Sequence, residues 1–138
     1  MELSVVLVNH NGAACLGTTL EALARNTVSE EVECIVVDSG SADGSWEGVE
    51  EAWPRARTLR FEENVGFCVG CNRGAEAASG YLLAFVNFDG EVEPGWDTPL
   101  IRLLDDPTTD KQQHQNSSSN RPSPSILSMI LFWRSACQ

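Results

Sequence analysis

Short apolar runs rich in β-branched residues alternate with segments of helical periodicity, and this alternation constrains the fold more than any other feature of the sequence. Each run has the length of a strand that is buried on both faces, as in a parallel sheet. The alternation predicts an α/β fold of three layers, α/β/α, with a mostly parallel sheet in the middle. The predicted strands are residues 3–8, 32–37, 57–61 and 81–86, and the predicted helices lie between residues 13 and 26, 45 and 53, 64 and 78, and 96 and 104. We expect the third of these helices to close at Gly80 with a glycine cap.

Polar loops come directly after three of the predicted strands, at residues 9–12, 38–44 and 87–90. Ligands of parallel sheets bind beyond the carboxyl ends of the strands, where such loops converge. We therefore expect Asp38, Asp43, Asn87 and Asp89 to lie along one edge of the sheet and to form an oxygen-rich pocket.

The triplet Asn87-Phe88-Asp89 places an amide and a carboxylate two residues apart, just after a strand. These are ligands for a hard cation such as Mg²⁺ or Mn²⁺, which usually binds together with substrate phosphates. Asn and Asp are also common turn residues, so the triplet alone has an ordinary structural explanation.

Two further segments could contact a nucleotide. The acceptors of residues 38–44 could bind a ring N–H or a ribose hydroxyl, although they also suit turns and helix caps. The helix expected after Asn64 has free N–H groups at its start that could receive phosphate oxygens. Arg73 could add a cationic contact, but it could equally pair with Glu76 on the surface of that helix.

Charge and length exclude several function classes. The net charge of −11 has the wrong sign for binding a phosphate backbone, so nucleic acid is not an expected partner. At 138 residues the chain has room for one domain, which we place at residues 1–106. Residues 107–138 are poor in acidic residues and rich in Ser, Gln, Asn and Pro, and we expect a disordered tail with a short apolar end at residues 126–133. That apolar run is too short for a transmembrane segment, which needs about 20 residues.

The five cysteines are an odd number, and no signal peptide is recognisable at the start of the chain. We therefore expect reduced thiols and a cytoplasmic location. Cys68 and Cys71 form a lone Cys-x-x-Cys motif, which we expect to pack within a helix because a zinc site needs four ligands. His10 follows a strand and could line the pocket, without a partner that would mark it as catalytic.

Taken in order, three segments of the chain resemble family 2 glycosyltransferases, which have the nucleotide-diphospho-sugar transferase (GT-A) fold. The likeness covers about residues 3–106. Within the family, the chain is most similar to the bacterial rhamnosyltransferase-like branch, whose metal motif reads Asn-Pro-Asp. In this chain Phe88 stands in place of that Pro. The matching segments are residues 4–12 (SVVLVNHNG), 32–45 (VECIVVDSGSADGS) and 63–96 (ENVGFCVGCNRGAEAASGYLLAFVNFDGEVEPGW).

The resemblance implies binding of a nucleotide-diphospho-sugar donor and transfer of its sugar to an acceptor hydroxyl. By the same resemblance, Asp89 would hold the metal ion between the two phosphates, and Asn87 would face the ribose or the metal. Arg73 would face the nucleotide. The base would lie near Val8 and Asn9, with Asp38 accepting a hydrogen bond from it and Asp43 close by.

The resemblance ends where members of the family continue into a half that binds the acceptor and carries the general base. In this sequence the polar tail from Pro107 takes that place, so no catalytic base can be assigned and the acceptor stays unknown. We expect a truncated enzyme that is reduced largely to donor binding. A non-catalytic interaction module and a truncated product without function are the alternatives.

Overall fold

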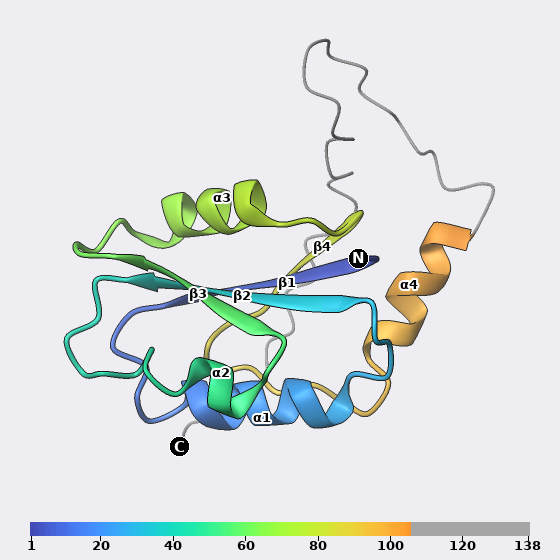
Figure 1. Ribbon diagram of the computed structural model, residues 1–138, viewed down its shortest axis with the longest axis horizontal. Helices are drawn as coiled ribbons and strands as arrows, with labels where there is room; N and C mark the ends of the chain where they lie inside the picture. The colour runs from blue at the N-terminus through green and yellow to red at the C-terminus, as the bar shows by residue number, and fades with distance from the viewer. Residues whose placement is uncertain (106–138) are drawn as a thin grey trace, which may run out of the picture.

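Four parallel strands form one sheet in the order β3-β2-β1-β4 (Figure 1). The structure is a computed structural model and describes residues 1–105, so the expected tail at residues 107–138 lies outside the described residues. The strands are β1 Leu3–Asn9, β2 Val32–Ser39, β3 Ala56–Phe61 and β4 Leu82–Phe85. The helices are α1 Leu16–Asn26, α2 Val49–Ala52, α3 Phe67–Ala77 and α4 Asp97–Asp105.

The predicted three-layer α/β/α arrangement is confirmed. Helix α3 covers one face of the sheet, and α1 and α2 cover the other (Figure 1). Side chains of β1 alternate between these layers, since Val5 and Leu7 belong to the core on the side of α1 whereas Val6 belongs to the core on the side of α3. Because β1 lies between β2 and β4, the loops that follow these three strands all start at the same edge of the sheet.

Two glycines let α3 lie very close to the sheet. A Cβ atom at Gly70 would lie 2.7 Å from Cγ1 of Val8, and one at Gly74 would overlap the side chain of Val6. The first of these contacts is at the carboxyl end of β1, next to Asn9. The first turn of α3 is therefore part of the wall around that edge.

Two local predictions are wrong. The helix expected over residues 45–53 is reduced to the four residues of α2, because Gly44 has a φ of 72° and Gly48 precedes the helix. Gly80 is not the expected helix cap, since α3 ends in the extended residue Ala78. Gly80 instead donates its N–H to Oγ of Ser4 at 2.8 Å, where a side chain would meet the backbone of β1.

The cysteines differ in part from the expectation of reduced thiols. Cys34, Cys68 and Cys71 are free, but Cys15 is disulfide-bonded. Cys68 is exposed, so the expectation that both thiols of the Cys-x-x-Cys motif pack within the fold is wrong for this residue. None of the helices within residues 1–105 has the length and apolar character that a membrane crossing requires.

Candidate functional site

The site begins where β1 and β2 end side by side. Asn9 and Asp38 are register partners in the last positions shared by these strands, and both side chains are fully buried. The loop after β4 reaches the same place, because the ring of Phe88 lies against Gly12, where a Cβ would come within 2.8 Å of Cδ2. Three loops distant in the sequence therefore meet at the carboxyl edge of the sheet.

Asn9 links the first two loops through its amide nitrogen. Nδ2 lies 2.9 Å from Oδ1 of Asp38, 2.8 Å from Oγ of Ser45 and 3.2 Å from Oγ of Ser41. Oδ1 of Asn9 has no hydrogen-bond partner among the described residues and faces Gly12. Asn9 is thus a donor that ties the end of β1 to the loop after β2.

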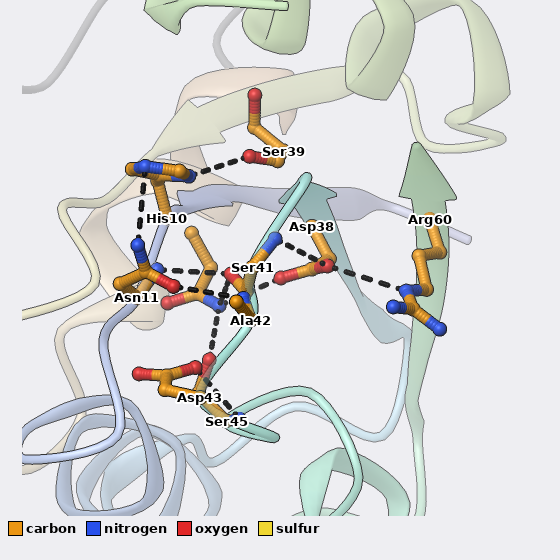
Figure 2. A network of polar contacts seen from close by, with 10 residues as sticks. His10, Asn11, Asp38, Ser39, Ser41, Ala42, Asp43, Ser45 and Arg60 are labelled. Atoms are coloured by element: carbon orange, nitrogen blue, oxygen red, sulfur yellow. Dashed lines mark hydrogen bonds and ion pairs between the residues drawn. The ribbon is translucent and has the colours of Figure 1, made fainter. Parts of the chain in front are cut away.

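Asn11 adds a second link between the same loops (Figure 2). Its φ of 53° is in the left-handed region, which Asn tolerates better than most residues. In this conformation its N–H donates to Oγ of Ser41 at 2.9 Å, and its Oδ1 accepts the N–H of Ala42 at 2.9 Å. The two loops are held in a fixed relation by backbone and side-chain bonds together.

Asp43 forms the third link. Its carboxylate accepts the N–H of Ala13 at 2.9 Å and the N–H of Ser45 at 3.0 Å. Hydrogen bonding with Ser45 lowers the pKa of Asp43, and the bond from Ala13 adds to this effect, against a smaller opposing effect of desolvation. The carboxylate is therefore charged at neutral pH and acts as an acceptor between the loops.

Asp38 is held from three sides. Besides the bond from Asn9, Oδ2 lies 3.3 Å from the N–H of Ser41 and 3.6 Å from Nε of Arg60. The guanidinium of Arg60 in turn lies 4.1 Å from the ring centroid of Trp46, within the range of a cation–π contact. Figure 2 shows Arg60 approaching Asp38 from β3. This arrangement balances a buried carboxylate with one cation and two hydrogen-bond donors.

His10 is one of the exposed groups of this network. Nδ1 lies 2.6 Å from the carbonyl oxygen of Ser39, and Nε2 lies 3.2 Å from Nδ2 of Asn11. A single neutral tautomer satisfies both contacts, with Nδ1 as the donor and Nε2 as the acceptor. The imidazole is thereby fixed in orientation beside the site, as the sequence suggested, and it has no carboxylate partner among residues 1–105.

Asn87 and Asp89 differ from the other expected site residues because their side chains have no polar partner among the described residues. Both are half-buried, and neither side chain makes a hydrogen bond or an ion pair with the described residues. The backbone between them is fixed by the N–H of Gly90, which donates to the carbonyl of Asn87 at 2.9 Å. The turn therefore presents two free oxygen ligands beside the other two loops.

Arg73 lies at the border of the site, outside its polar network. Its guanidinium pairs with Glu76 at 2.9 Å on the exposed surface of α3. An exposed pair of this kind contributes little to stability and is easily exchanged for another anion. Arg73 is one turn beyond Gly70, which contacts Val8, so it lies on the helix that borders the site without entering the polar network.

Sequence reasoning placed the right loops at this edge but missed several members of the network. Ser45 and Arg60 hold Asn9 and Asp38, and no pattern in the sequence singled them out, whereas Ser41 belongs to the segment 38–44 that the sequence did mark. The pair Asn11-Gly12 does carry a signal, because an Asn followed by Gly is typical of a left-handed turn position.

Comparison with known proteins assigns the family. The family model described as "Glycosyl transferase family 2" matches residues 4–130. The chain belongs to glycosyl transferase family 2. A curated relative in that comparison, the uncharacterized glycosyltransferase YibD of Escherichia coli strain K12, is 35% identical over 109 residues. The match covers 76% of this chain and 31% of YibD, so the chain spans about a third of the length of such relatives.

Solved structures of glycosyltransferases have the same fold. TarS of S. aureus in complex with UDP superposes with a TM-score of 0.70 at 24% identity, over 76% of this chain and 32% of TarS. The mannosyltransferase PcManGT of Pyrobaculum calidifontis, in complex with GDP-Man and Mn2+, gives a TM-score of 0.66 at 23% identity, over 78% of this chain and 33% of PcManGT. At this identity the likeness establishes the GT-A fold for residues of the family 2 domain, as expected from the sequence.

Proposed function

We propose that this family 2 chain binds a nucleotide-diphospho-sugar donor at the carboxyl edge of its sheet and serves the transfer of the sugar to an acceptor hydroxyl. The observation that carries the proposal is the meeting of three loops at that edge, two of them locked together and the third presenting Asn87 and Asp89 unengaged. Complexes of the two structural neighbours with UDP and with GDP-Man support a nucleotide ligand.

The base of the nucleotide is proposed to lie against Val8, which is half-buried at the carboxyl end of β1. Asn9, Asp38 and Asp43 border this place, but their donor and acceptor groups are largely used within the loops. Asp38 is fully buried and has three contacts, so a hydrogen bond from the base would take the place of one of them. We propose that Asp38 accepts this bond from the base and otherwise keeps the loop in position. Arg73 would contact the nucleotide only if its ion pair with Glu76 were broken.

The unengaged ligands Asn87 and Asp89 fit a divalent cation, Mg²⁺ or Mn²⁺. Such an ion is commonly held by one or two protein oxygens and completes its shell with phosphate oxygens and water. Residues 1–105 contain no cluster of three or more His, Cys, Asp or Glu that could hold a metal by themselves, so phosphate oxygens and water would have to supply the other ligands. When bound, the ion would offset the charge that develops on the leaving diphosphate.

Asp89 would hold the ion by its carboxylate, and Asn87 would contribute its amide oxygen to the ion or accept a ribose hydroxyl. The turn that holds both residues is closed by the N–H of Gly90, which donates to the carbonyl of Asn87. The sequence Asn87-Phe88-Asp89 also supports, as a proposal, a place in the rhamnosyltransferase-like branch. A cytoplasmic location stays a prediction. The acceptor and the general base are not assigned.

We propose that residues 1–105 by themselves support little or no transfer. A positioned general base contributes about 10²–10⁴-fold to a rate, and no residue of the described site is placed to act as one. Donor binding and slow donor hydrolysis are the activities expected of residues 1–105.

Calorimetric titration with UDP, GDP and dTDP tests the proposal. At least one should bind, and more tightly with Mn²⁺ than in EDTA. Asp89→Ala should abolish the difference between the two conditions, whereas Glu91→Ala, which removes an exposed carboxylate two residues away, should preserve it. Absence of binding by all three nucleotides would reject donor binding, and equal affinity with and without metal would remove Asp89 from the site.

A further inference from the structure

Two cysteines lie at the start of α3, at the border of the proposed nucleotide site. Cys68 is the second residue of the helix and Cys71 the fifth, and both thiols are free. Nothing in the function proposed above uses them. We propose that Cys68 and Cys71 form a site of thiol–disulfide exchange with a small disulfide such as glutathione disulfide, and that their disulfide weakens nucleotide binding. The second part of this proposal rests on the proposed function.

The spacing of the two residues suits a disulfide that tightens the helix. Residues three apart in a helix lie on one face, with Cα atoms about 5 Å apart and Cβ atoms about 5–6 Å apart. A disulfide accepts Cα separations of about 4.4–6.8 Å and needs Cβ separations of about 3.5–4.5 Å. The Cα atoms are thus already in range, and the Cβ atoms must approach by about 1–2 Å. The first turn of a helix can tighten in this way by taking a 3₁₀ form.

The different environments of the two thiols give the order of reaction. Cys68 is exposed and meets the small disulfide first, whereas Cys71 is half-buried. Burial raises the pKa of Cys71, and the neighbouring Cys68 raises it further. The Cys68 thiolate attacks glutathione disulfide, forming a mixed disulfide and releasing one glutathione. Cys71 then loses its proton and attacks the Cys68 sulfur, which releases the second glutathione. Two protein thiols are oxidised, and one glutathione disulfide is reduced to two thiols.

Other chemistry for these thiols is less well supported. A zinc site needs four ligands, and the described part of the chain offers no suitable group of three for a metal ion. Cys34 cannot compete in the exchange, because it is fully buried and desolvation raises its pKa strongly. Exchange between the two helical cysteines is the reaction that the exposed and half-buried positions favour.

Gly70 links the disulfide of Cys68 and Cys71 to the proposed nucleotide site. It lies between the two cysteines in the same turn, and its Cα packs against Val8, leaving no room for even one methyl group. The turn starts at Gly66, whose φ of 80° lies in the region that glycine adopts readily. Tightening the turn therefore moves it against Val8, the residue proposed to face the base, and against the adjoining end of β1. A close-packed contact of this kind transmits small displacements.

The experiment uses the full chain in glutathione buffers of graded ratio. Trypsin cleavage after Arg60 and Arg73 places both cysteines in one peptide, residues 61–73, free of any other cysteine. In oxidising buffer this peptide should lose two hydrogens and carry no glutathione. Cys71→Ser should instead carry one glutathione on the peptide. Nucleotide affinity, measured on the same samples with the nucleotide that binds best, should fall at least about fivefold on oxidation.

The double variant Cys68→Ser/Cys71→Ser is the matched control, because it keeps the disulfide of Cys15 and so isolates any effect of the buffers on that disulfide. Its nucleotide affinity should not change with the glutathione ratio. By reciprocity, saturating nucleotide should shift the native protein toward the reduced form by the same factor. A peptide that stays reduced, or that carries only mixed disulfides, would overturn the exchange, and an intramolecular disulfide with unchanged affinity would overturn the coupling. If the reduced protein bound no nucleotide, the proposed function and the coupling would both fail, while the peptide masses would still decide the exchange.

Discussion

Replacing Asn9 by Ala tests whether the polar network holds the loops of the site together. Nδ2 carries two hydrogens but has three acceptors within 3.2 Å, so it makes about two full hydrogen bonds at a time. The bond to the Asp38 carboxylate contributes about 1.5–3 kcal/mol and the bond to a serine hydroxyl about 0.5–1.5 kcal/mol. We therefore expect Asn9→Ala to lower the free energy of unfolding by about 2–4 kcal/mol.

Urea unfolding followed by tryptophan fluorescence measures this loss, because Trp53 and Trp96 are buried in the core and report its exposure. With an m-value of about 2 kcal/mol/M, the midpoint should fall by about 1–2 M. Asn72→Ala is the matched control, since Asn72 is exposed on α3 and makes no hydrogen bond with the described residues. Its stability should stay within about 0.5 kcal/mol of native, because Ala favours a helix.

A second substitution at the same position separates the hydrogen-bond donor from the volume of the side chain. Asn9→Asp keeps the size but places a carboxylate where Nδ2 faces Asp38, in a fully buried position. Two unshielded carboxylates at this distance repel, so we expect a larger loss than for Asn9→Ala at neutral pH. A loss below about 0.5 kcal/mol for Asn9→Ala, or native stability of Asn9→Asp, would refute the role of Asn9 as the donor that joins the loops.

The remaining predictions concern the frame around the site. Gly74→Ala should destabilise the protein by about 1–3 kcal/mol because its methyl group would overlap Val6, whereas Gly17→Ala, which meets nothing within 4 Å, should be neutral or stabilising; thermal unfolding compares the two. Burial acts to raise the pKa of Glu33, but hydrogen bonds from two serines and the charge of an arginine outweigh it, so the folded pKa lies below the ordinary value of 4.5. The stability that charged Glu33 contributes is therefore present above pH 4.5 and lost as the pH falls through the folded pKa, and urea unfolding curves of the native protein and Glu33→Gln should converge on acidification.

The sequence predicted the sheet because three of its strands, β1, β2 and β4, are nearly continuous apolar runs that suit burial on both faces. The same pattern placed the loops after residues 8, 37 and 86 at one edge, since parallel strands end together. The length of α2 could not be predicted as well, because its expected segment contains Gly44 and Gly48, and the left-handed φ of Gly44 appears only in the folded loop.

The hydrogen bonds and ion pairs among the residues of the site could not be predicted from the sequence. Asn9, Asp38 and Asp43 have side chains that suit a ligand contact and a turn contact equally well, so only their positions decide between the two. Arg60 reaches Asp38 because β3 pairs with β2 in the register that places the two residues side by side. That register depends on the packing of whole strands and on the loop between them, and no local pattern encodes it.

The site therefore divides into groups that build a frame and groups that remain free. Asn9 donates to Asp38, and Asp43 accepts the N–H groups of Ala13 and Ser45, so bonds within the protein hold the first two loops in place. A nucleotide entering such a site loses little affinity to the ordering of loops, because this cost is met during folding. The free groups, Asn87 and Asp89, are few and lie on the third loop. On this division, substitutions in the frame should lower stability and nucleotide affinity together, whereas substitutions at Asp89 should lower metal-dependent affinity and leave stability unchanged.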